Sequence, residues 1–359
     1  MKATFFRIDW WLLLPVTILL LFSFATLLSL QSSFAQSQFV SLILSVVVFI
    51  FFSQIDYRSL QNFRLPIYLL SLFLFGLTLV LGFESRGAVR WIEIFGVSAQ
   101  FSEIMKPFLL FALAGYLVAK DRYTFRSFIT ILLFATPLVL LTYAQPDLGN
   151  ALIYLGVTMS ILFFSGFPLL WFVFLSIPVA ILLPFIWSRF HEYQRIRVLT
   201  FLNPTSDPQG TSYNAIQSII AVGSGMLLGR GAQEGTQAEL FFLPERHTDF
   251  IFATISEGYG FLGAVAIILA FLFLFYRIYW ILQRTDEPYA KIIALGTLLL
   301  IFVHFFVNIG MNIGVFPIVG VTLPFVSLGG SSLLSNFILL GVLSSISTSL
   351  RRTETLEIH

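Results

Sequence analysis

The stretch Trp10–Leu30, WWLLLPVTILLLFSFATLLSL, contains no charged side chain. A helix that crosses a membrane needs about 20 apolar residues, whereas the apolar part of a signal peptide has about 7–15. Lys2 and Arg7 precede the stretch in the way that basic residues precede a signal sequence. Because of its length, we nevertheless interpret it as a first membrane helix that is retained in the protein.

The composition of the whole chain extends this interpretation. Of its 359 residues, 58% are hydrophobic and only 11% are charged, whereas soluble domains carry about 25% charged residues. Such a chain cannot cover its surface with polar groups, so most of that surface must face lipid. The net charge of +2 is too small to indicate a nucleic-acid partner, and the absence of cysteine excludes disulfides, thiolate metal sites and a cysteine nucleophile.

Runs of about 20 apolar residues predict ten membrane helices. The runs are 10–30, 39–54, 66–83, 104–119, 128–144, 149–165, 168–188, 249–276, 290–311 and 322–348. Pro178 and Pro184 are expected to kink or break the seventh helix, and a long polar loop, about 189–248, separates it from the eighth. The predicted fold is therefore an all-α, polytopic membrane protein with a single transmembrane domain over residues 1–359.

Lysine and arginine residues in the short loops predict the orientation of the chain. With the N-terminus inside, most of these cations fall on the inner side, as the positive-inside rule requires. Both termini are therefore expected in the cytoplasm, and the long loop is expected to be extracytoplasmic. The remaining cations lie in two outer segments, where they run against this trend and suggest a function.

Two of the outer segments place carboxylates near the ends of predicted helices. In residues 85–108, apolar and charged residues alternate, which we interpret as a helix lying in the membrane interface. Glu103 and Lys106 at its end share a helix face, either as an anchoring ion pair or as functional groups entering the membrane. In AQPDLGN, residues 144–150, Asp147 is more readily interpreted as a helix cap than as a catalytic group.

Two further segments combine polar groups with flexible backbone. Arg195, Arg197 and Arg230 of the long loop suit either a phosphate-bearing ligand or anionic lipid headgroups. The Gly-Gly-Ser-Ser stretch that holds Ser331 and Ser332 permits either close helix packing or exposure of backbone N–H groups to a ligand.

The sequence LPERHTDFIF, residues 243–252, places ionisable side chains at the start of the eighth span. Asp249 is expected in the first helical turn, where it could cap the helix or accept a proton beside Arg246 and His247. The chain has no P-loop, GxGxxG, HExxH or GxSxG motif, so ATP-driven transport and zinc hydrolysis have no support.

Six motifs together carry a family resemblance. GAVRWI, QFSEIMK, AQPDLGNAL, SGMLLGRG, LPERHTDFIF and LPFVSLGGSS, in this order, resemble the SEDS family (shape, elongation, division, sporulation), and its elongation-associated members more than its division-associated ones. The resemblance implies a peptidoglycan glycosyltransferase that polymerises lipid II at the outer face of the bacterial cytoplasmic membrane. It also implies a divalent cation, Mg²⁺ or Mn²⁺, a class B penicillin-binding protein and other elongation-complex membrane proteins as partners.

The resemblance also assigns roles to residues. It makes Asp249, Glu103 and Lys106 catalytic, with Asp249 as the expected general base. Pyrophosphate is a good leaving group, so one carboxylate with cations around it should suffice, and the candidates for binding it are Arg90, Arg195, Arg197, Arg230, Arg246, Ser331 and Ser332. The family usually has a second acidic residue at the position of Gly258. Its absence here argues against a catalytic role for a second carboxylate at this place.

Two other functions are the alternatives to a glycosyltransferase: a flippase that transports a lipid-linked precursor, and a non-catalytic scaffold.

Overall fold

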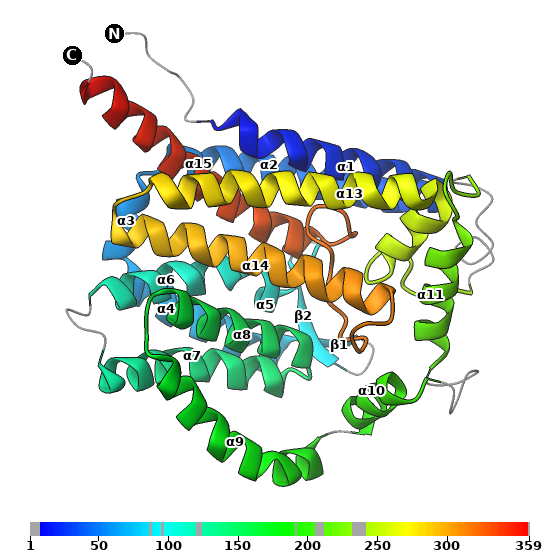
Figure 1. The fold of residues 1–359 in the computed structure, drawn as a ribbon, viewed down its shortest axis with the longest axis horizontal. Helices are drawn as coiled ribbons and strands as arrows, with labels where there is room; N and C mark the ends of the chain where they lie inside the picture. The colour runs from blue at the N-terminus through cyan, green and yellow to red at the C-terminus, as the bar shows by residue number, and fades with distance from the viewer. Residues whose placement is uncertain are drawn as a thin grey trace.

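The computed structural model describes residues 8–85, 88–94, 97–119, 124–190, 192–204, 212–231 and 242–357. These residues form a bundle of long helices with one small sheet (Figure 1). The long helices are α1 (Trp10–Leu30), α2 (Ser32–Gln54), α4 (Arg64–Leu81), α7 (Phe125–Ala144), α8 (Leu148–Phe164), α9 (Leu169–Arg189), α13 (Ile251–Arg284), α14 (Pro288–Asn312) and α15 (Gly330–Glu357). The shorter ones are α3 (Tyr57–Asn62), α5 (Phe101–Ile104), α6 (Lys106–Val118), α10 (Glu192–Leu202) and α11 (Tyr213–Ser224).

The helices account for all ten predicted membrane spans. Eight segments in the described part of the chain are long and apolar enough to cross a membrane, one of them formed by α5 and α6 together. The two others are shorter apolar helices, α8 and residues 169–185 of α9. The prediction of an all-α, polytopic membrane protein is therefore confirmed.

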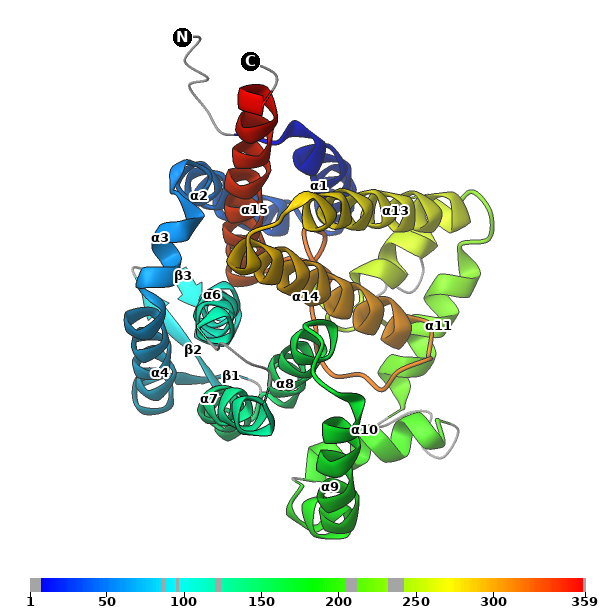
Figure 2. The ribbon, with the colours of Figure 1, turned by 60° about the vertical axis from the view of Figure 1, so that its left-hand side comes forward.

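The core lies where α15 packs along α2 and where α13 packs between α1 and α14 (Figures 1 and 2). Large side chains such as Phe111, Phe271 and Phe325 are buried there. A buried ion pair fixes one end of this core: Arg277 of α13 donates its Nε–H to Asp9 at 3.1 Å, and Asp9 also caps α1 by accepting from the Trp11 N–H. α1 begins and α15 ends at this same end of the bundle (Figure 1).

A small antiparallel sheet replaces the interfacial helix that we expected at the start of residues 85–108. Its strands are β1 (Phe83–Ser85), β2 (Ala88–Ile94) and β3 (Val97–Ala99), with Glu84 opposite Val89 and Glu93 opposite Ser98. The helix prediction was wrong because the alternation of apolar and charged residues has a period of two, which places side chains on opposite faces of a strand. Helix begins only at Phe101.

Helix α13 changes direction at Gly260, whose backbone lies outside the helical region (φ 68°, ψ −163°). The segment 225–231, which follows α11, packs against α13 at this bend. Backbone hydrogen bonds join the segment to α13: the Arg230 N–H donates to the Glu257 carbonyl, and the Phe261 N–H donates to the Met226 carbonyl. Glycines are required here because a Cβ at Gly225 or Gly229 would overlap the backbone of α13.

The seventh span and the long polar loop differ from expectation. Pro178 and Pro184 lie within one helix, α9, so the prolines do not break the span, which was one of the two outcomes considered. α9 lies at the edge of the bundle with most of its apolar side chains exposed (Figures 1 and 2). The described part of the segment 189–248 contains α10 and α11 and is therefore largely helical.

Candidate functional site

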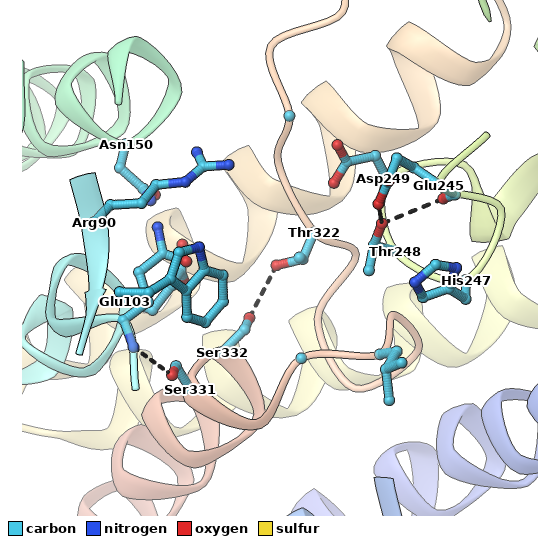
Figure 3. A pocket seen from close by; sticks show the side chains of 15 residues that line it. Arg90, Glu103, Asn150, Glu245, His247, Thr248, Asp249, Thr322, Ser331 and Ser332 are labelled. Carbon is cyan, nitrogen blue, oxygen red and sulfur yellow. Dashed lines mark hydrogen bonds between the residues drawn. The ribbon is translucent and has the colours of Figure 1, made fainter. Parts of the chain in front are cut away.

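Four of the five polar segments singled out in the sequence meet at one cavity of about 230 Å³ (Figure 3). Arg90 of β2 and Glu103 of α5 form one wall, and Asp249 lies across from them. The other lining residues are Trp91, Gln100, Asn150, Glu245, His247, Thr248, Gly320, Thr322, Leu328, Gly329, Ser331 and Ser332. Residues far apart in the chain thus converge on one site, as their common outer position in the predicted topology requires.

Asp249 lies in a turn that precedes α13, not in the first turn of the helix as expected. Glu245 has a left-handed backbone (φ 54°), and its carbonyl accepts hydrogen bonds from Thr248 N–H at 3.0 Å and Phe250 N–H at 3.2 Å. These bonds close the turn, and α13 begins at Ile251 with Phe250 as its N-cap. Asp249 therefore does not occupy the N-cap position that we considered for it, because it precedes the N-cap residue Phe250. Thr248 Oγ1 donates back to the carbonyl and the carboxylate of Glu245.

Two asparagines of α14 hold the backbone of Asp249. The side-chain amides of Asn308 and Asn312 each donate to the Asp249 carbonyl at 3.0 Å. Asn312 Oδ1 also accepts from the Ala253 N–H at 3.1 Å, which supplies a partner for one of the first N–H groups of α13. The N-terminus of α13 is therefore capped by a side chain of α14, whereas a residue just before the helix would ordinarily cap it.

Gly320, in the loop 313–329 between α14 and α15, lies directly beside the carboxylate of Asp249. A Cβ added to Gly320 would be 3.5 Å from Asp249 Oδ2, and the glycine has φ of +74°. The close approach and the left-handed backbone both favour glycine at this position.

Glu103 and Lys106 form a buried ion pair, with 2.7 Å between Glu103 Oε1 and Lys106 Nζ. The side chain of Glu103 is 10% exposed and that of Lys106 is 3% exposed, so both charged groups are almost completely shielded from solvent. Lys106 Nζ also lies 2.9 Å from Nε2 of His304, a residue of α14 that the sequence analysis did not single out. The ion-pair interpretation is confirmed, and Glu103 of this pair lines the cavity.

Asp147 has the structural role that the sequence favoured. It is the N-cap of α8, where its carboxylate accepts from the Asn150 N–H at 3.2 Å. The same carboxylate accepts from the side-chain amides of Gln100 and Asn150, each at 2.9 Å. Asp147 thereby joins the start of α8 to the segment that leads into α5.

Ser331 and Ser332 line the cavity, but their hydroxyl groups bind neighbouring protein atoms. Ser331 Oγ accepts from the Gln100 N–H at 2.9 Å, and Ser332 Oγ accepts from Thr322 Oγ1 at 3.0 Å (Figure 3). Both therefore tie the start of α15 to the walls of the site.

Among the five predicted phosphate-binding arginines, which all lie in the described part of the chain, only Arg90 lines the cavity. Its side chain extends into the site (Figure 3), and its Nε is buried without a hydrogen-bond partner. Arg195 instead donates to the carbonyls of Trp187 and Ser188.

The three remaining arginines are also outside the cavity. Arg230 donates to the Ser224 carbonyl, and its neighbour Gly229 packs against α13, where a Cβ would lie 2.2 Å from the Gly258 carbonyl oxygen. Arg197 lines a separate small hollow, and Arg246 is a buried residue next to the site. The sequence grouped these residues because they share a loop, but helices α10 and α11 carry that loop away from the cavity.

His247 belongs to the wall that holds Asp249. Its ring stacks on Phe34 with 4.2 Å between the ring centroids, and its carbonyl accepts from the Leu328 N–H at 2.9 Å. The histidine therefore joins the turn before α13 to α2 and to the end of the loop 313–329.

The cavity holds three carboxylates, those of Glu103, Glu245 and Asp249. Within the described residues, no group of three or more histidine, aspartate and glutamate side chains is placed to hold a metal ion. A divalent cation at Asp249 would therefore need ligands from the substrate in addition to protein carboxylates, which is the usual way that Mg²⁺ is bound with phosphates.

Comparisons with known proteins place this chain among cell-wall enzymes. Residues 2–352 match the family model FtsW/RodA/SpoVE, described as a cell cycle protein. The peptidoglycan glycosyltransferase MrdB of Escherichia coli K12 is 37% identical over 309 residues, which cover 85% of this chain and 83% of MrdB. A probable peptidoglycan glycosyltransferase FtsW of Geobacter metallireducens is 34% identical over 327 residues, 89% of this chain and 86% of that protein.

Solved structures share the fold over nearly the whole chain. One comes from work on the structural coordination of polymerization and crosslinking by a peptidoglycan synthase complex, with a TM-score of 0.83 and 28% identity over 98% of this chain and 99% of that one. The rod shape determining protein RodA of Thermus thermophilus has a TM-score of 0.72 and 26% identity over 95% of this chain and 97% of its own.

Proposed function

Because the chain belongs to the FtsW/RodA/SpoVE family, we propose that it is a peptidoglycan glycosyltransferase that polymerises lipid II into glycan strands for cell elongation. The observation that carries the mechanism is the single cavity with Asp249 on one side and Arg90 and the Glu103–Lys106 pair on the other (Figure 3). This arrangement provides a base and cations at the same place, which glycosyl transfer from a pyrophosphate donor requires.

Asp249 is the proposed general base. A sugar hydroxyl of the acceptor loses its proton to the Asp249 carboxylate as its oxygen attacks the anomeric carbon of the donor, and the bond from that carbon to the pyrophosphate breaks. Asn308 and Asn312 fix the backbone that carries this carboxylate, so little reorganisation is needed when the substrates bind. One carboxylate is sufficient because pyrophosphate leaves without prior protonation, unlike the leaving group of a glycosidase.

Arg90 is the proposed contact for the departing pyrophosphate. Its guanidinium offers donors in a fixed fork that suits phosphate oxygens, and its buried Nε has no hydrogen-bond partner among the residues that the structure describes. Arg90→Ala is expected to lower kcat/KM by roughly 10–100-fold, the cost of one or two charge-assisted hydrogen bonds. Arg230→Ala, which changes an exposed arginine outside the cavity, is the matched control and should keep the wild-type kcat/KM.

A divalent cation, Mg²⁺ or Mn²⁺, fits this site if the substrate supplies phosphate ligands. The carboxylate of Asp249 points across the cavity and would hold the ion, whereas that of Glu245 points away from it and accepts a hydrogen bond from Thr248 (Figure 3). When bound, the ion would neutralise charge on the pyrophosphate. Polymerisation is therefore expected to stop when EDTA is added and to resume when Mg²⁺ or Mn²⁺ is restored.

The same proposal includes the setting of the enzyme. Both termini lie in the cytoplasm, which agrees with α1 beginning and α15 ending at one end of the bundle (Figure 1). The proposal assigns the cavity to the extracytoplasmic side. A class B penicillin-binding protein and other elongation-complex membrane proteins are the proposed partners. The likeness to a chain from a peptidoglycan synthase complex supports this.

The direct test is incubation of the purified protein with lipid II in detergent. Glycan polymer is the expected product, and it distinguishes an enzyme from a flippase because detergent micelles have no two compartments to transport between. A preparation that binds lipid II but yields no polymer, with or without a penicillin-binding protein and Mg²⁺, contradicts the proposal and favours transport.

A further inference from the structure

Helix α14 carries three polar side chains on one face: His304, Asn308 and Asn312, each four residues from the next, called here the α14 polar stripe. All three are buried, the two asparagines completely. Buried polar groups within a membrane span are costly unless they are hydrogen-bonded, and they usually have a function. Each member of the stripe is hydrogen-bonded, and the partners belong to different parts of the site.

The asparagine half of the stripe holds the Asp249 side of the cavity to the loop 313–329. Asn308 Nδ2 donates to the Asp249 carbonyl at 3.0 Å and to the Val321 carbonyl at 2.7 Å. One amide group thus bridges the turn before α13 and the loop that contains Gly320.

The histidine holds the opposite side of the cavity to the same loop. Lys106 Nζ, which is paired with Glu103, lies 2.9 Å from His304 Nε2, and His304 Nδ1 lies 3.3 Å from the Thr322 carbonyl. An ammonium group only donates hydrogen bonds, so Nε2 must accept and Nδ1 must carry the proton that it donates to Thr322. The contacts therefore select one neutral tautomer of His304.

The two halves meet at consecutive residues, because Asn308 binds Val321 and His304 binds Thr322. We propose that the α14 polar stripe is the positioning element of the site, and that His304 is a positioning residue that orients the ammonium of Lys106. A lysine side chain is long and flexible, and Glu103 and His304 together fix two of its three N–H directions. This inference rests on the proposed catalytic roles of Lys106 and Asp249.

Two substitutions separate the bonds of His304. In His304→Gln, the amide oxygen reaches the position of Nε2 and can accept from Lys106, whereas in His304→Asn the shorter amide reaches only the position of Nδ1 and can donate to Thr322. His304→Asn is expected to lower kcat by roughly 10–100-fold with KM for lipid II nearly unchanged, as small misplacements of catalytic groups do. His304→Gln is expected to keep most of the activity.

Thr297→Val is the matched control on the same helix. Thr297 is fully buried, and its Oγ1 has no hydrogen-bond partner among the described residues. This change should therefore leave kcat unaltered and should not lower the unfolding temperature. Equal loss of kcat in His304→Asn and His304→Gln, accompanied by equal loss of thermal stability, would assign His304 a structural role only and overturn the proposal.

Lys106→Met distinguishes the failure of this inference from the failure of the proposed function. If Lys106→Met is inactive while His304→Asn polymerises lipid II at the wild-type rate, the positioning role is wrong and the catalytic assignment stands. If Lys106→Met itself works at the wild-type rate, the assignment of Lys106 fails, and the role of His304 fails with it.

Discussion

The Glu103–Lys106 pair offers a test that separates a structural anchor from a functional group. Lys106→Met removes one charge and leaves the Glu103 carboxylate without its 2.7 Å partner. Glu103→Gln does the reverse and leaves the ammonium of Lys106 without its carboxylate. The double variant removes both charges and keeps side chains of similar size.

The expected magnitudes follow from burial. The two side chains are 10% and 3% exposed, and removing one partner of a buried ion pair costs about 3–5 kcal/mol because the other charge stays buried and unpaired. Replacing both partners by neutral groups of similar volume is often close to neutral. We therefore expect each single variant to lose about 3–5 kcal/mol of unfolding free energy and the double variant to lie within about 1–2 kcal/mol of wild type.

The assay combines unfolding in detergent with lipid II polymerisation for all three variants. All three are expected to be inactive, including the double variant whose stability is restored. Arg58→Met is the control for the stability scale, because Arg58 is about half exposed (54%) and pairs with Asp56 (54% exposed) and Glu287 (30% exposed) near the surface. Each of these two pairs is expected to contribute at most about 1 kcal/mol. A double variant that polymerises lipid II at the wild-type rate would show that the pair is an anchor and refute the functional interpretation.

Further predictions concern glycines at close contacts. A Cβ at Gly225 would lie 1.8 Å from the Ser256 carbonyl oxygen, so Gly225→Ala should lower the unfolding temperature markedly; Gly223→Ala has nothing within 4 Å and should not. Gly320→Ala should destabilise the fold by only about 1–3 kcal/mol, the usual cost of a left-handed non-glycine residue. Its new Cβ beside Asp249 should nevertheless reduce kcat, and an unchanged kcat in a steady-state assay would contradict that placement.

Composition and apolar periodicity were sufficient to predict the spans and the place of the site. The helices from α1 to α15 follow the ten apolar runs because the bilayer imposes a length that local sequence alone reveals. Asp249 and Glu103 were noticed because charged residues at the ends of apolar runs are conspicuous, whereas their catalytic roles and the choice of Arg90 came with the family resemblance. Their convergence follows from the topology, which places all of their segments on one side of the membrane.

Other features depend on contacts that the sequence does not display. His304, Asn308 and Asn312 lie inside an apolar run and were counted as part of a span. Their spacing of four residues was the available signal, because it places them on one helix face. The bend of α13 arises from packing of the segment 225–231 at Gly260, and no local pattern shows that packing. The sheet at residues 83–99 was misassigned although its alternation was visible, because proximity to the membrane favoured an interfacial helix.

The central claim is that the Asp249 carboxylate removes the acceptor proton, and Asp249→Asn tests it most directly. The amide has nearly the same shape but cannot accept that proton. We predict that purified Asp249→Asn protein forms glycan strands from lipid II 10²–10⁴-fold more slowly than wild type, roughly the contribution of a general base. Its unfolding temperature and its affinity for lipid II should stay near those of wild type. Polymerisation by the folded variant at the wild-type rate would contradict the assignment of Asp249 as the base.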